Sequence, residues 1–455
     1  MMKLIKKGVG LMGDILFLIA KDFDTAHNYS LLSKELERRG INTVHLAWDA
    51  IDNFFYEKVN IKPIKVYNNY SEVNNDEYNT INNEYDLEKI IKYEYELSKY
   101  NNVEVDKKIF KKKAAFTIKV LSNLNRSVKF NTIIMWGESY IYERAAKQYG
   151  LKNNKKMRFL ENGYFRPFTI TWDKSGVNYN NSLPRDKDFY KKLETKSLKK
   201  EQFFKPLKVS RATLQTKKNF ITKLMIYLKE FNLPFISNEE FKENNFKILK
   251  NKINKFIARR TKKNINNEIL NDDYIFVPFQ VESDSQIILH SRIKSMYQFV
   301  KIVSKQVKKF NESYNKNYKV IFKTHPHDFN LSTEKIYSLI NEYDNIHLIN
   351  GGDTEVLIKN SKLVITINST VGIEALLNKK KVITLGEAFY NIDGIVDHCN
   401  DFEKLYYKIN ETLNKKFDEV LINKFLTYLR LRYFKEFYWN FPDDKSIELL
   451  ADDVS

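Results

Sequence analysis

Side chains suited to holding a charged substrate stand together in Leu160-Glu161-Asn162-Gly163-Tyr164-Phe165-Arg166-Pro167. Glu161 offers a carboxylate for base or nucleophile work, and Arg166 offers a guanidinium that binds a carboxylate or a phosphate through two hydrogen bonds. Glu138 is a second acid, at the end of a neighbouring expected strand. Two carboxylates at one edge of a sheet are the minimal equipment for glycosyl transfer with acid/base assistance. The alternative is a structural ion pair between Glu161 and Arg166.

A second segment, Asn368-Ser369-Thr370-Val371-Gly372, lies where an expected strand turns into an expected helix. Ser369 and Thr370 can cap that helix, and its free N–H groups and dipole make an anion site suited to a nucleotide phosphate. Glu374 falls on the first helical turn, where it could reach a ribose hydroxyl. The alternative is an ordinary capping box, in which Ser or Thr is followed by Glu.

A third segment, Thr324-His325-Pro326-His327, follows an expected strand directly. Proline fixes the backbone beyond His325, and the imidazole can donate to a phosphate or a leaving group. His325 and His327 point apart if the chain is extended, and Asp328 is the one obvious acidic neighbour, so a metal site is a weak interpretation. We therefore expect neither a metal nor a cofactor.

Polar residues also follow the expected strand Tyr274–Pro278, at Gln280, Asp284-Ser285-Gln286 and His290-Ser291. They are suited to form a roof over a bound nucleotide. The alternative is a polar loop without a specific role.

The composition limits the classes of protein to consider. A chain of 455 residues predicts two domains. The formal charge of +19 indicates nucleic acid, an anionic membrane surface or a polyanionic substrate as partner, or a general drift toward Lys. We exclude nucleic acid, because no stacking motif of aromatic and basic residues stands out. Cys399 is the one cysteine, which rules out an intramolecular disulfide and fits a reducing cytoplasm.

The apolar stretch Val9–Ala20 is too short for a membrane span and is broken by Asp14. We interpret it as a buried first strand rather than a signal peptide. Any membrane contact should then be peripheral. Lys-rich helices in residues 190–270 are either solvated faces or a contact with anionic lipid.

The elements that position these residues predict an α/β protein. In the first half we expect a long loop with short helices over 65–105, and strands and helices at 10–21, 28–39, 41–48, 132–136, 144–149 (capped by Gly150) and 157–160. In the second half we expect them at 274–278, 294–310, 319–323, 346–348, 354–359, 363–367, 371–377 and 381–385, followed by a helical tail over 401–450. Glu161 should lie just past the carboxyl end of a strand, where ligands bind in open α/β sheets.

Taken in order, these motifs resemble the capsular polysaccharide β-Kdo transferases of Gram-negative bacteria, of the KpsS/LipB type. The resemblance spans about residues 130–395 and rests on the following residues: Gly137-Glu138, Glu161 to Pro167, Gly176-Val177-Asn178, Leu183-Pro184-Arg185-Asp186, Gln280, Asp284-Ser285-Gln286, His290-Ser291, His325-Pro326, Ser369-Thr370-Val371-Gly372 and Ala375-Leu376. It implies a GT-B-like fold, with two Rossmann-like doubly wound domains, a cleft between them and a C-terminal crossover helix.

The resemblance also implies an organisation into four parts. Residues 1–190 would form an N-terminal acceptor domain and 191–270 a helical linker. Residues 271–400 would form the nucleotide-sugar domain, and 401–455 would be helices that pack back on the N-terminal domain.

The resemblance further implies CMP-Kdo as donor and a (lyso)phosphatidylglycerol acceptor at the inner face of the inner membrane, with other capsule proteins as partners. We expect Glu161, Glu138 and His325 to be catalytic. Donor contacts are expected from Ser369, Thr370, Gly372, Glu374, His325, Pro326, Gln280, Asp284, Ser285 and Gln286. Substrate contacts are expected from Arg166, Asn162, Tyr164, Asn178 and Arg185.

The sequence departs from the family pattern at two positions. Asn162 stands where related Kdo transferases carry an Asp, and Glu138 stands where an Asp is expected. The rival hypotheses are a non-catalytic scaffold for capsule export and another GT-B transferase, such as a sialyl- or polyol-phosphate transferase.

Overall fold

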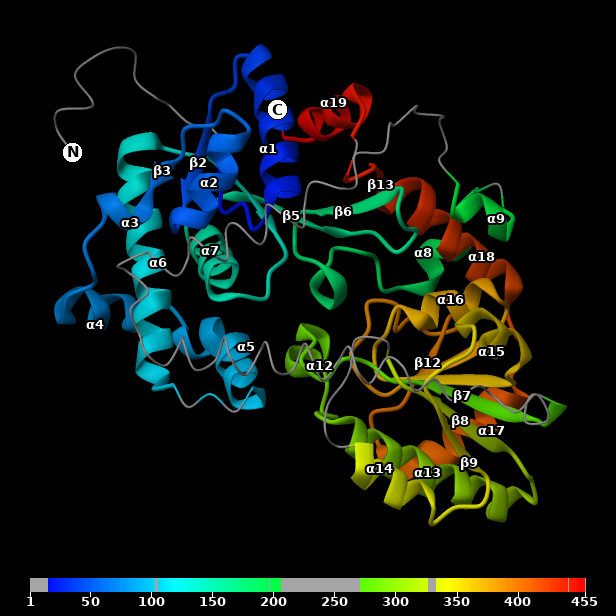
Figure 1. Ribbon diagram of the computed structural model, residues 1–455. Helices are drawn as coiled ribbons and strands as arrows, with labels where there is room; N and C mark the ends of the chain where they lie inside the picture. Colours follow the sequence, from blue (N-terminus) through cyan, green and yellow to red (C-terminus); the bar gives the residue numbers. More distant parts are fainter. Residues whose placement is uncertain are drawn as a thin grey trace. The chain divides into compact units, whose positions relative to one another are not determined.

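The computed structural model describes residues 15–205 apart from 102, 104 and 196, residues 271–325, and residues 333–454 apart from 441. The chain divides into two compact units (Figure 1). Unit 1 takes in the described parts of Met1–Ser182, Glu201–Ile236 and Arg430–Ser455, and unit 2 those of Leu183–Lys200 and Ser237–Leu429. Most of the expected linker 191–270 lies outside the described residues.

The sheet of unit 1 has the strand order β13-β6-β5-β4-β1-β2-β3. Its strands are β1 (Ile15–Phe17), β2 (Thr43–Ala47), β3 (Ile64–Lys65), β4 (Thr132–Trp136), β5 (Lys156–Asn162), β6 (Thr169–Asp173) and β13 (Lys435–Glu436). β1 to β5 are parallel, whereas β6 runs antiparallel to β5 and β13 antiparallel to β6. The sequence predicted the parallel part and missed the β5–β6 hairpin.

The helices of unit 1 are α1 (Phe23–Arg38), α2 (Ala50–Lys58), α3 (Val66–Asn69), α4 (Asn75–Glu84), α5 (Leu87–Tyr100), α6 (Lys107–Val128), α7 (Ile141–Lys152), α19 (Asp444–Asp452) and, at the unit boundary, α9 (Lys200–Phe203). Of these, α1 and α7 are longer than the sequence predicted, and α2 and α6 were not predicted. Of the long loop with short helices expected over 65–105, the helices are present and the long loop is wrong, because Asn74 and Asp86 cap two helices that fill most of this stretch. The helix end expected at Gly150 is wrong as well. α7 continues through this glycine, where a Cβ would lie 2.7 Å from the Met157 sulfur.

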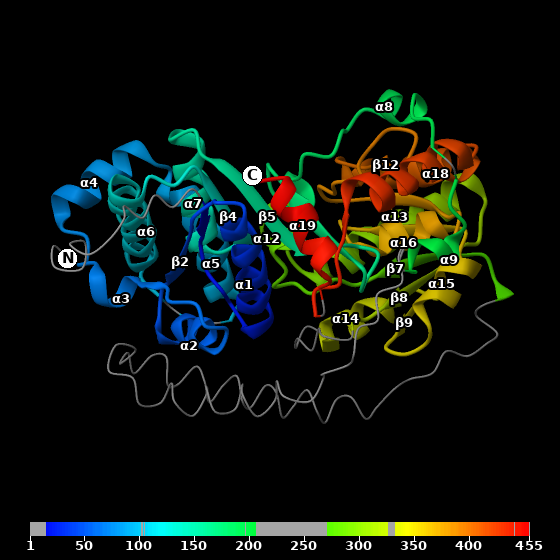
Figure 2. The ribbon, with the colours of Figure 1, turned by 90° about the horizontal axis from the view of Figure 1, so that it is seen from above.

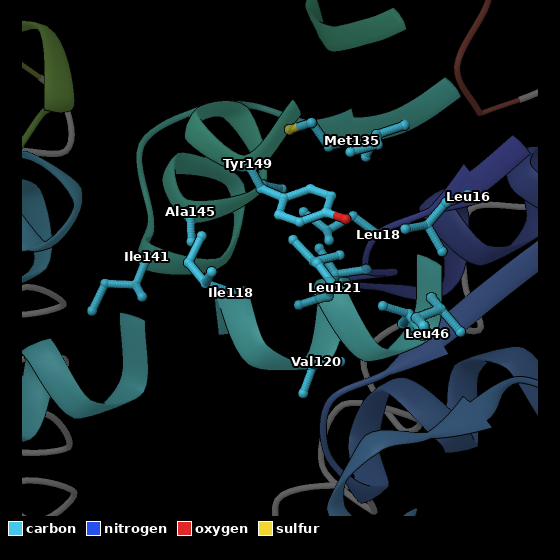
Figure 3. Packing of buried hydrophobic residues seen from close by; sticks show 14 of the residues in the cluster. Leu16, Leu18, Leu46, Ile118, Val120, Leu121, Met135, Ile141, Ala145 and Tyr149 are labelled. Atoms are coloured by element: carbon cyan, nitrogen blue, oxygen red, sulfur yellow. The ribbon is translucent and has the colours of Figure 1, made fainter. Parts of the chain in front are cut away.

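The two faces of this sheet bury separate clusters. Alternate residues point to opposite faces of a strand, so Leu16 joins one cluster while Ile15 and Phe17 join the other. Figure 3 shows the first cluster, where α6 and α7 pack side chains such as Leu121 and Tyr149 against the sheet. The second cluster includes residues of α1, α2 and α19, and α19 lies beside α1 in Figures 1 and 2.

The sheet of unit 2 has the order β12-β11-β10-β7-β8-β9 and is parallel throughout. Its strands are β7 (Tyr274–Pro278), β8 (Lys319–Lys323), β9 (Ile346–Ile349), β10 (Leu363–Thr366), β11 (Lys381–Thr384) and β12 (Asp397–His398). Its helices are α8 (Lys187–Lys191), α12 (Ser285–His290), α13 (Met296–Tyr314), α14 (Thr333–Ile340), α15 (Thr354–Asn360), α16 (Val371–Leu377), α17 (Leu405–Asn414) and α18 (Glu419–Tyr428). These bounds follow the sequence prediction closely, because strands buried on both faces appear as short continuous apolar runs.

Apart from the antiparallel edge of unit 1, both sheets share one strand order. In each, the first three strands lead outward to one side and the fourth returns beside the first. This is the doubly wound Rossmann arrangement, so the fold is GT-B-like, with two Rossmann-like units. The strand order reverses between β1 and β4 in unit 1 and between β7 and β10 in unit 2. Ligands of such sheets bind outside the carboxyl ends of the strands at this switch point.

The C-terminal tail divides between the two units. α17 and α18 belong to unit 2, and the chain joins unit 1 from Arg430 onward. The expected packing of helices 401–455 on the N-terminal domain is therefore wrong for α17 and α18. In the part that belongs to unit 1, the aromatic run from Phe434 onward forms β13 and loops instead of a helix, because β13 pairs with β6, and α19 follows.

Candidate active site

The switch point of unit 2 is bridged by two amide side chains. Gln280 follows β7 and Asn368 follows β10, and both are buried. The Gln280 Nε2–H donates to Asn368 Oδ1, and the Asn368 backbone N–H donates to Gln280 Oε1, each at 2.9 Å. Asn368 Nδ2 also faces the carbonyls of Gln286, His290 and Glu387 at 2.9, 3.4 and 3.3 Å. Asn368 thus ties three loops at one edge of the sheet, a role that the sequence did not reveal.

The Ser369 segment is held from two sides. The Val371 N–H donates to Ser369 Oγ at 3.2 Å, and the Tyr390 hydroxyl donates to the Ser369 carbonyl. A Cβ on Gly372 would lie 2.7 Å from Tyr390 Cζ, which explains the glycine. Thr370 precedes α16 but makes no capping hydrogen bond with its side chain, so that part of the capping expectation is wrong.

His325 acts electrostatically on Asp284, and both residues were expected at the donor site. Asp284 caps α12, where its Oδ1 accepts the Gln286 N–H at 2.8 Å. Burial raises the pKa of the Asp284 carboxyl, while this hydrogen bond and the nearby His325 oppose the rise. Ser285 lies in the first turn of α12, and Pro326 lies outside the described residues.

Lys323 is a cation at this edge that the sequence analysis missed. It ends β8, and its Nζ donates to the Gly352 carbonyl at 2.8 Å and to Thr354 Oγ1 at 2.5 Å. Burial lowers the pKa of the ammonium, and the nearby Asp353 and Glu374 oppose that change. Lys323 therefore brings a positive charge near Glu374, which was expected to reach a ribose.

In unit 1, Glu161 is the second-to-last residue of β5 rather than lying past the end of the strand. It stands opposite Thr171 of β6, so Glu161 lies on the strand of a β-hairpin and the segment after Asn162 forms the hairpin loop. Its side chain is half-buried, and Glu161 Oε1 accepts the N–H of the exposed Asn162 at 2.9 Å. The parallel-strand pattern expected here did not anticipate this hairpin.

An ion pair with one buried partner marks the switch point of unit 1. The Lys21 ammonium follows β1 and contacts the carboxylate of Glu143, which is fully buried on α7. The same ammonium lies 4.5 Å from the centre of the Tyr140 ring. Burial lowers the pKa of Lys21, but Glu143, with smaller contributions from Tyr140 and Glu161, outweighs it and leaves that pKa raised. Lys21 thus places a cation near Glu161, and sequence patterns gave no signal for it.

Glu138, the second expected catalytic acid, is 6% exposed and supports its surroundings. Its Oε2 pairs with Lys147 at 2.5 Å, and its Oε1 accepts the Val177 N–H at 3.1 Å. A Cβ on Gly176 would lie 2.7 Å from Oε2. These contacts favour a supporting role, and catalysis by Glu138 stays a prediction.

The expected substrate residues fall in different units. The Tyr164 hydroxyl donates to Asn178 Oδ1 at 2.6 Å, and Arg166 Nε faces the Gly163 carbonyl at 3.3 Å, all in unit 1. Arg185 belongs to unit 2. The structure therefore joins Tyr164 and Asn178 by a hydrogen bond, whereas the two expected cations, Arg166 and Arg185, fall in different units.

Among the described residues, no group of three or more His, Cys, Asp or Glu side chains could hold a metal ion. Within the same part of the chain, no helix is long and apolar enough to cross a bilayer.

Comparisons with known proteins relate the chain to capsule synthesis. It is 28% identical over 322 residues to the capsule polysaccharide export protein KpsS of Escherichia coli, covering 67% of this chain and 80% of that protein. It is 28% identical over 287 residues to the capsule polysaccharide modification protein LipB of Neisseria meningitidis serogroup B, covering 58% of this chain and 65% of LipB. Among solved structures, a β-Kdo 2,7 transferase, KpsC of Thermosulfurimonas dismutans, matches with a TM-score of 0.35 and 16% identity over 74% of this chain and 90% of that one.

The family model described as "capsule polysaccharide biosynthesis protein" matches residues 131–431. This span includes the acidic hairpin, the polar network of unit 2 and Asp173. The chain belongs to the capsule polysaccharide biosynthesis protein family.

Proposed function

We propose that the chain is a retaining β-Kdo glycosyltransferase that uses CMP-Kdo to add the first Kdo of the capsule linker to (lyso)phosphatidylglycerol. Membership of the capsule polysaccharide biosynthesis family supports a role in making capsule. The resemblance of the motifs to capsular β-Kdo transferases suggests the donor and the acceptor.

The observation that carries the proposal is the amide network of Gln280 and Asn368 at the switch point of unit 2. It fixes the loops at the edge of the sheet where nucleotides bind in doubly wound folds. Ser369 and Thr370 would hold the phosphate of CMP-Kdo. His325, beside Asp284, would donate to the phosphate as CMP leaves.

Unit 1 would supply the acceptor site and the reacting carboxylate. Transfer from CMP-β-Kdo to a β-linked product retains configuration. Glu161 would either attack the anomeric carbon and form a covalent intermediate, or stabilise an oxocarbenium ion. In both routes the bond between the sugar and the CMP phosphate breaks, and an acceptor hydroxyl forms the new glycosidic bond.

The enzyme would work as a peripheral protein at the cytoplasmic face of the inner membrane. The net charge of +19 would contribute about 1 kcal/mol of attraction per Lys or Arg near anionic lipid. Binding to phosphatidylglycerol vesicles should therefore weaken as salt is raised. Vesicle binding that is indifferent to salt and to anionic lipid would remove this role.

The first test is a transfer assay with purified protein, CMP-Kdo and a fluorescent lysophosphatidylglycerol, read by mass spectrometry. A gain of one Kdo is expected. No product together with saturable CMP binding would point to another sugar or acceptor. Neither product nor CMP binding would favour a scaffold for capsule export.

The residue-level test is Glu161→Gln, with Glu57→Gln as a matched control at an exposed acid of unit 1. The amide cannot act as nucleophile, so turnover should fall at least about 100-fold while CMP affinity is unchanged. Turnover like that of the wild type would remove Glu161 from the mechanism.

A further inference from the structure

Asp173, the last residue of β6, is a buried carboxylate that organises the segment after it. Its Oδ1 accepts the N–H groups of Ser175 at 2.6 Å and Gly176 at 3.2 Å. Its Oδ2 accepts the N–H and the hydroxyl of Ser182 at 2.9 and 2.8 Å, and the hydroxyl of Tyr433 at 3.0 Å. Both ends of the segment 174–182 are therefore fastened to one side chain, which is 3% exposed.

The middle of the segment 174–182 is fastened as well. Glu138 accepts the Val177 N–H at 3.1 Å from the other side. Asn178 begins a 3₁₀ turn with φ of 51°, a left-handed conformation that few residues other than glycine adopt. The Tyr164 hydroxyl donates to Asn178 Oδ1 at 2.6 Å, so the segment is joined to the hairpin loop that directly follows Glu161 and Asn162 of β5.

The C-terminal tail completes this arrangement from a distant part of the sequence. Tyr433 donates to Asp173, and the Phe434 ring lies 5.3 Å from the Tyr164 ring and 5.8 Å from the Phe165 ring, measured between centroids. The Phe437 N–H donates to the Phe168 carbonyl at 3.0 Å. The tail thus contacts both the hairpin loop and the carboxylate that orders its neighbour.

Asp173 itself is unsuited to react with a substrate. A carboxylate offers about four lone-pair positions, and five donors already surround this one. Such a group stabilises a single backbone arrangement, which is what a site that must hold reacting groups within a fraction of an ångström requires.

We propose that Asp173, with Tyr433 of the tail, is a positioning residue for the reaction: it fixes Asn178, and through the Asn178–Tyr164 hydrogen bond it fixes the segment that carries Glu161. This inference rests on the proposed function, in which Glu161 reacts. It adds that a carboxylate outside the reacting group, and a residue from the other end of the chain, set the geometry of that group.

The test is a double-mutant cycle of Asp173→Asn and Tyr164→Phe in the full chain. Asp173→Asn should lower kcat at least 10-fold with little change in CMP affinity, because the amide offers one acceptor oxygen to donors that need both. Tyr164→Phe removes the link through which Asp173 acts. In the Tyr164→Phe background, Asp173→Asn should therefore lower kcat less than 3-fold further. If the double variant instead loses kcat by the product of the two single losses, the two residues act independently and the proposal fails. A purely structural role of Asp173 would not depend on Tyr164.

Two controls separate positioning from general destabilisation. Ile118→Val removes one methyl group from the buried core of α6, and its kcat should stay within 2-fold of wild type. Tyr433→Phe deletes one of the five donors to Asp173, and its kcat should fall about 3-fold. A tenfold fall in the kcat of Ile118→Val would mean that kcat responds to stability in general. The double-mutant cycle would then no longer support a positioning role for Asp173.

Hydrogen exchange decides the matter without activity. In Asp173→Asn, amides of 174–182 and also of 163–166 should exchange faster, whereas in the Tyr164→Phe background the amides of 163–166 should gain nothing further. Faster exchange confined to 174–182 would show that Asp173 does not act on the acidic segment. If the wild type transfers no Kdo, the proposed function fails, while this measurement still tests the structural coupling.

Discussion

The two switch points are built on the same strand order but with different chemistry. At that of unit 1, buried carboxylates pair with partly exposed lysines: Glu143 with Lys21, and Glu138 with Lys147. At that of unit 2, where Lys323 also lies, the loops are joined by neutral amides and a hydroxyl, those of Gln280, Asn368 and Tyr390. The same backbone topology therefore does not dictate the electrostatics of its binding edge.

The ion pairs of unit 1 and the amide network of unit 2 should respond differently to substitution. A buried ion pair gains little net stability, but the loss of one partner leaves a charge without compensation. A neutral amide network carries no charge to desolvate, yet each unpaired group still has a cost. Unit 1 should therefore be sensitive to charge changes, and unit 2 to changes in hydrogen-bonding geometry.

The largest effect is expected from Lys21→Met. Glu143 is fully buried, and among the described residues its carboxylate pairs with Lys21 alone, so the variant would leave a buried carboxylate without a partner. The free energy of unfolding should fall by about 3–5 kcal/mol, measured by urea denaturation. The double variant Lys21→Met/Glu143→Gln should regain most of this loss. If it does not, the charge of Glu143 is not the cause.

A slightly smaller effect is expected from Asn368→Asp in unit 2. The carboxylate keeps the shape of the amide but cannot donate to the Gln286 carbonyl, and it brings a charge into a buried position. Unfolding free energy should fall by about 2–4 kcal/mol, and CMP affinity should fall with it. Asn360→Asp, at an exposed position of α15, is the matched control. Equal losses in the two variants would contradict the importance of the network.

Gly372→Ala should cause a loss of about 1–3 kcal/mol through overpacking. The added Cβ would meet the Tyr390 ring, which supports the Ser369 carbonyl. Thermal unfolding measures the loss. Combining the change with Tyr390→Phe should relieve only part of it, because ring carbon atoms are also too close. Full tolerance of Gly372→Ala would mean that the tyrosine moves freely.

The last comparison is in the pH dependence of stability, where single residues of the two units contribute with opposite sign. Burial lowers the pKa of His45 in unit 1 to about 3, against 6.5 when exposed. The unfolded chain then binds more protons between these values, so His45 makes stability fall as pH drops from 6.5 toward 3. Its slope reaches at most about 1.4 kcal/mol per pH unit.

Asp284 in unit 2 acts in the opposite direction. Burial raises its pKa above the ordinary 3.8, so the folded chain binds the proton more tightly than the unfolded chain does. Stability therefore rises as pH falls from the raised pKa toward 3.8. Urea titrations of His45→Phe and Asp284→Asn between pH 4 and 7 would measure both slopes. In His45→Phe, the free energy of unfolding should fall less steeply as pH is lowered. In Asp284→Asn, the rise in the free energy of unfolding that Asp284 contributes at low pH should be absent. A wild-type slope in His45→Phe would show that this histidine does not titrate on unfolding.

The sequence predicted unit 2 well for a definite reason. Parallel strands buried on both faces are short apolar runs, and the bounds of β7, β8 and α16 match the expected ranges. Unit 1 was harder to predict. The Asn-rich stretch 65–105 hides its helices, since Asn disfavours helix interiors while favouring the caps that begin them. The short β13 depends on pairing with β6, more than 260 residues away along the chain.

By itself, then, the sequence determined the alternation of strands and helices, the two Rossmann-like halves, and which loops carry polar groups. These are properties of local pattern: periodicity, caps and the residues that follow each strand. Only the tertiary structure decided that Lys21 faces Glu143, that Asn368 ties three loops together, and that Tyr433 completes the surroundings of Asp173. Such pairings join residues far apart along the chain, and burial, which is a property of the folded molecule, makes them matter.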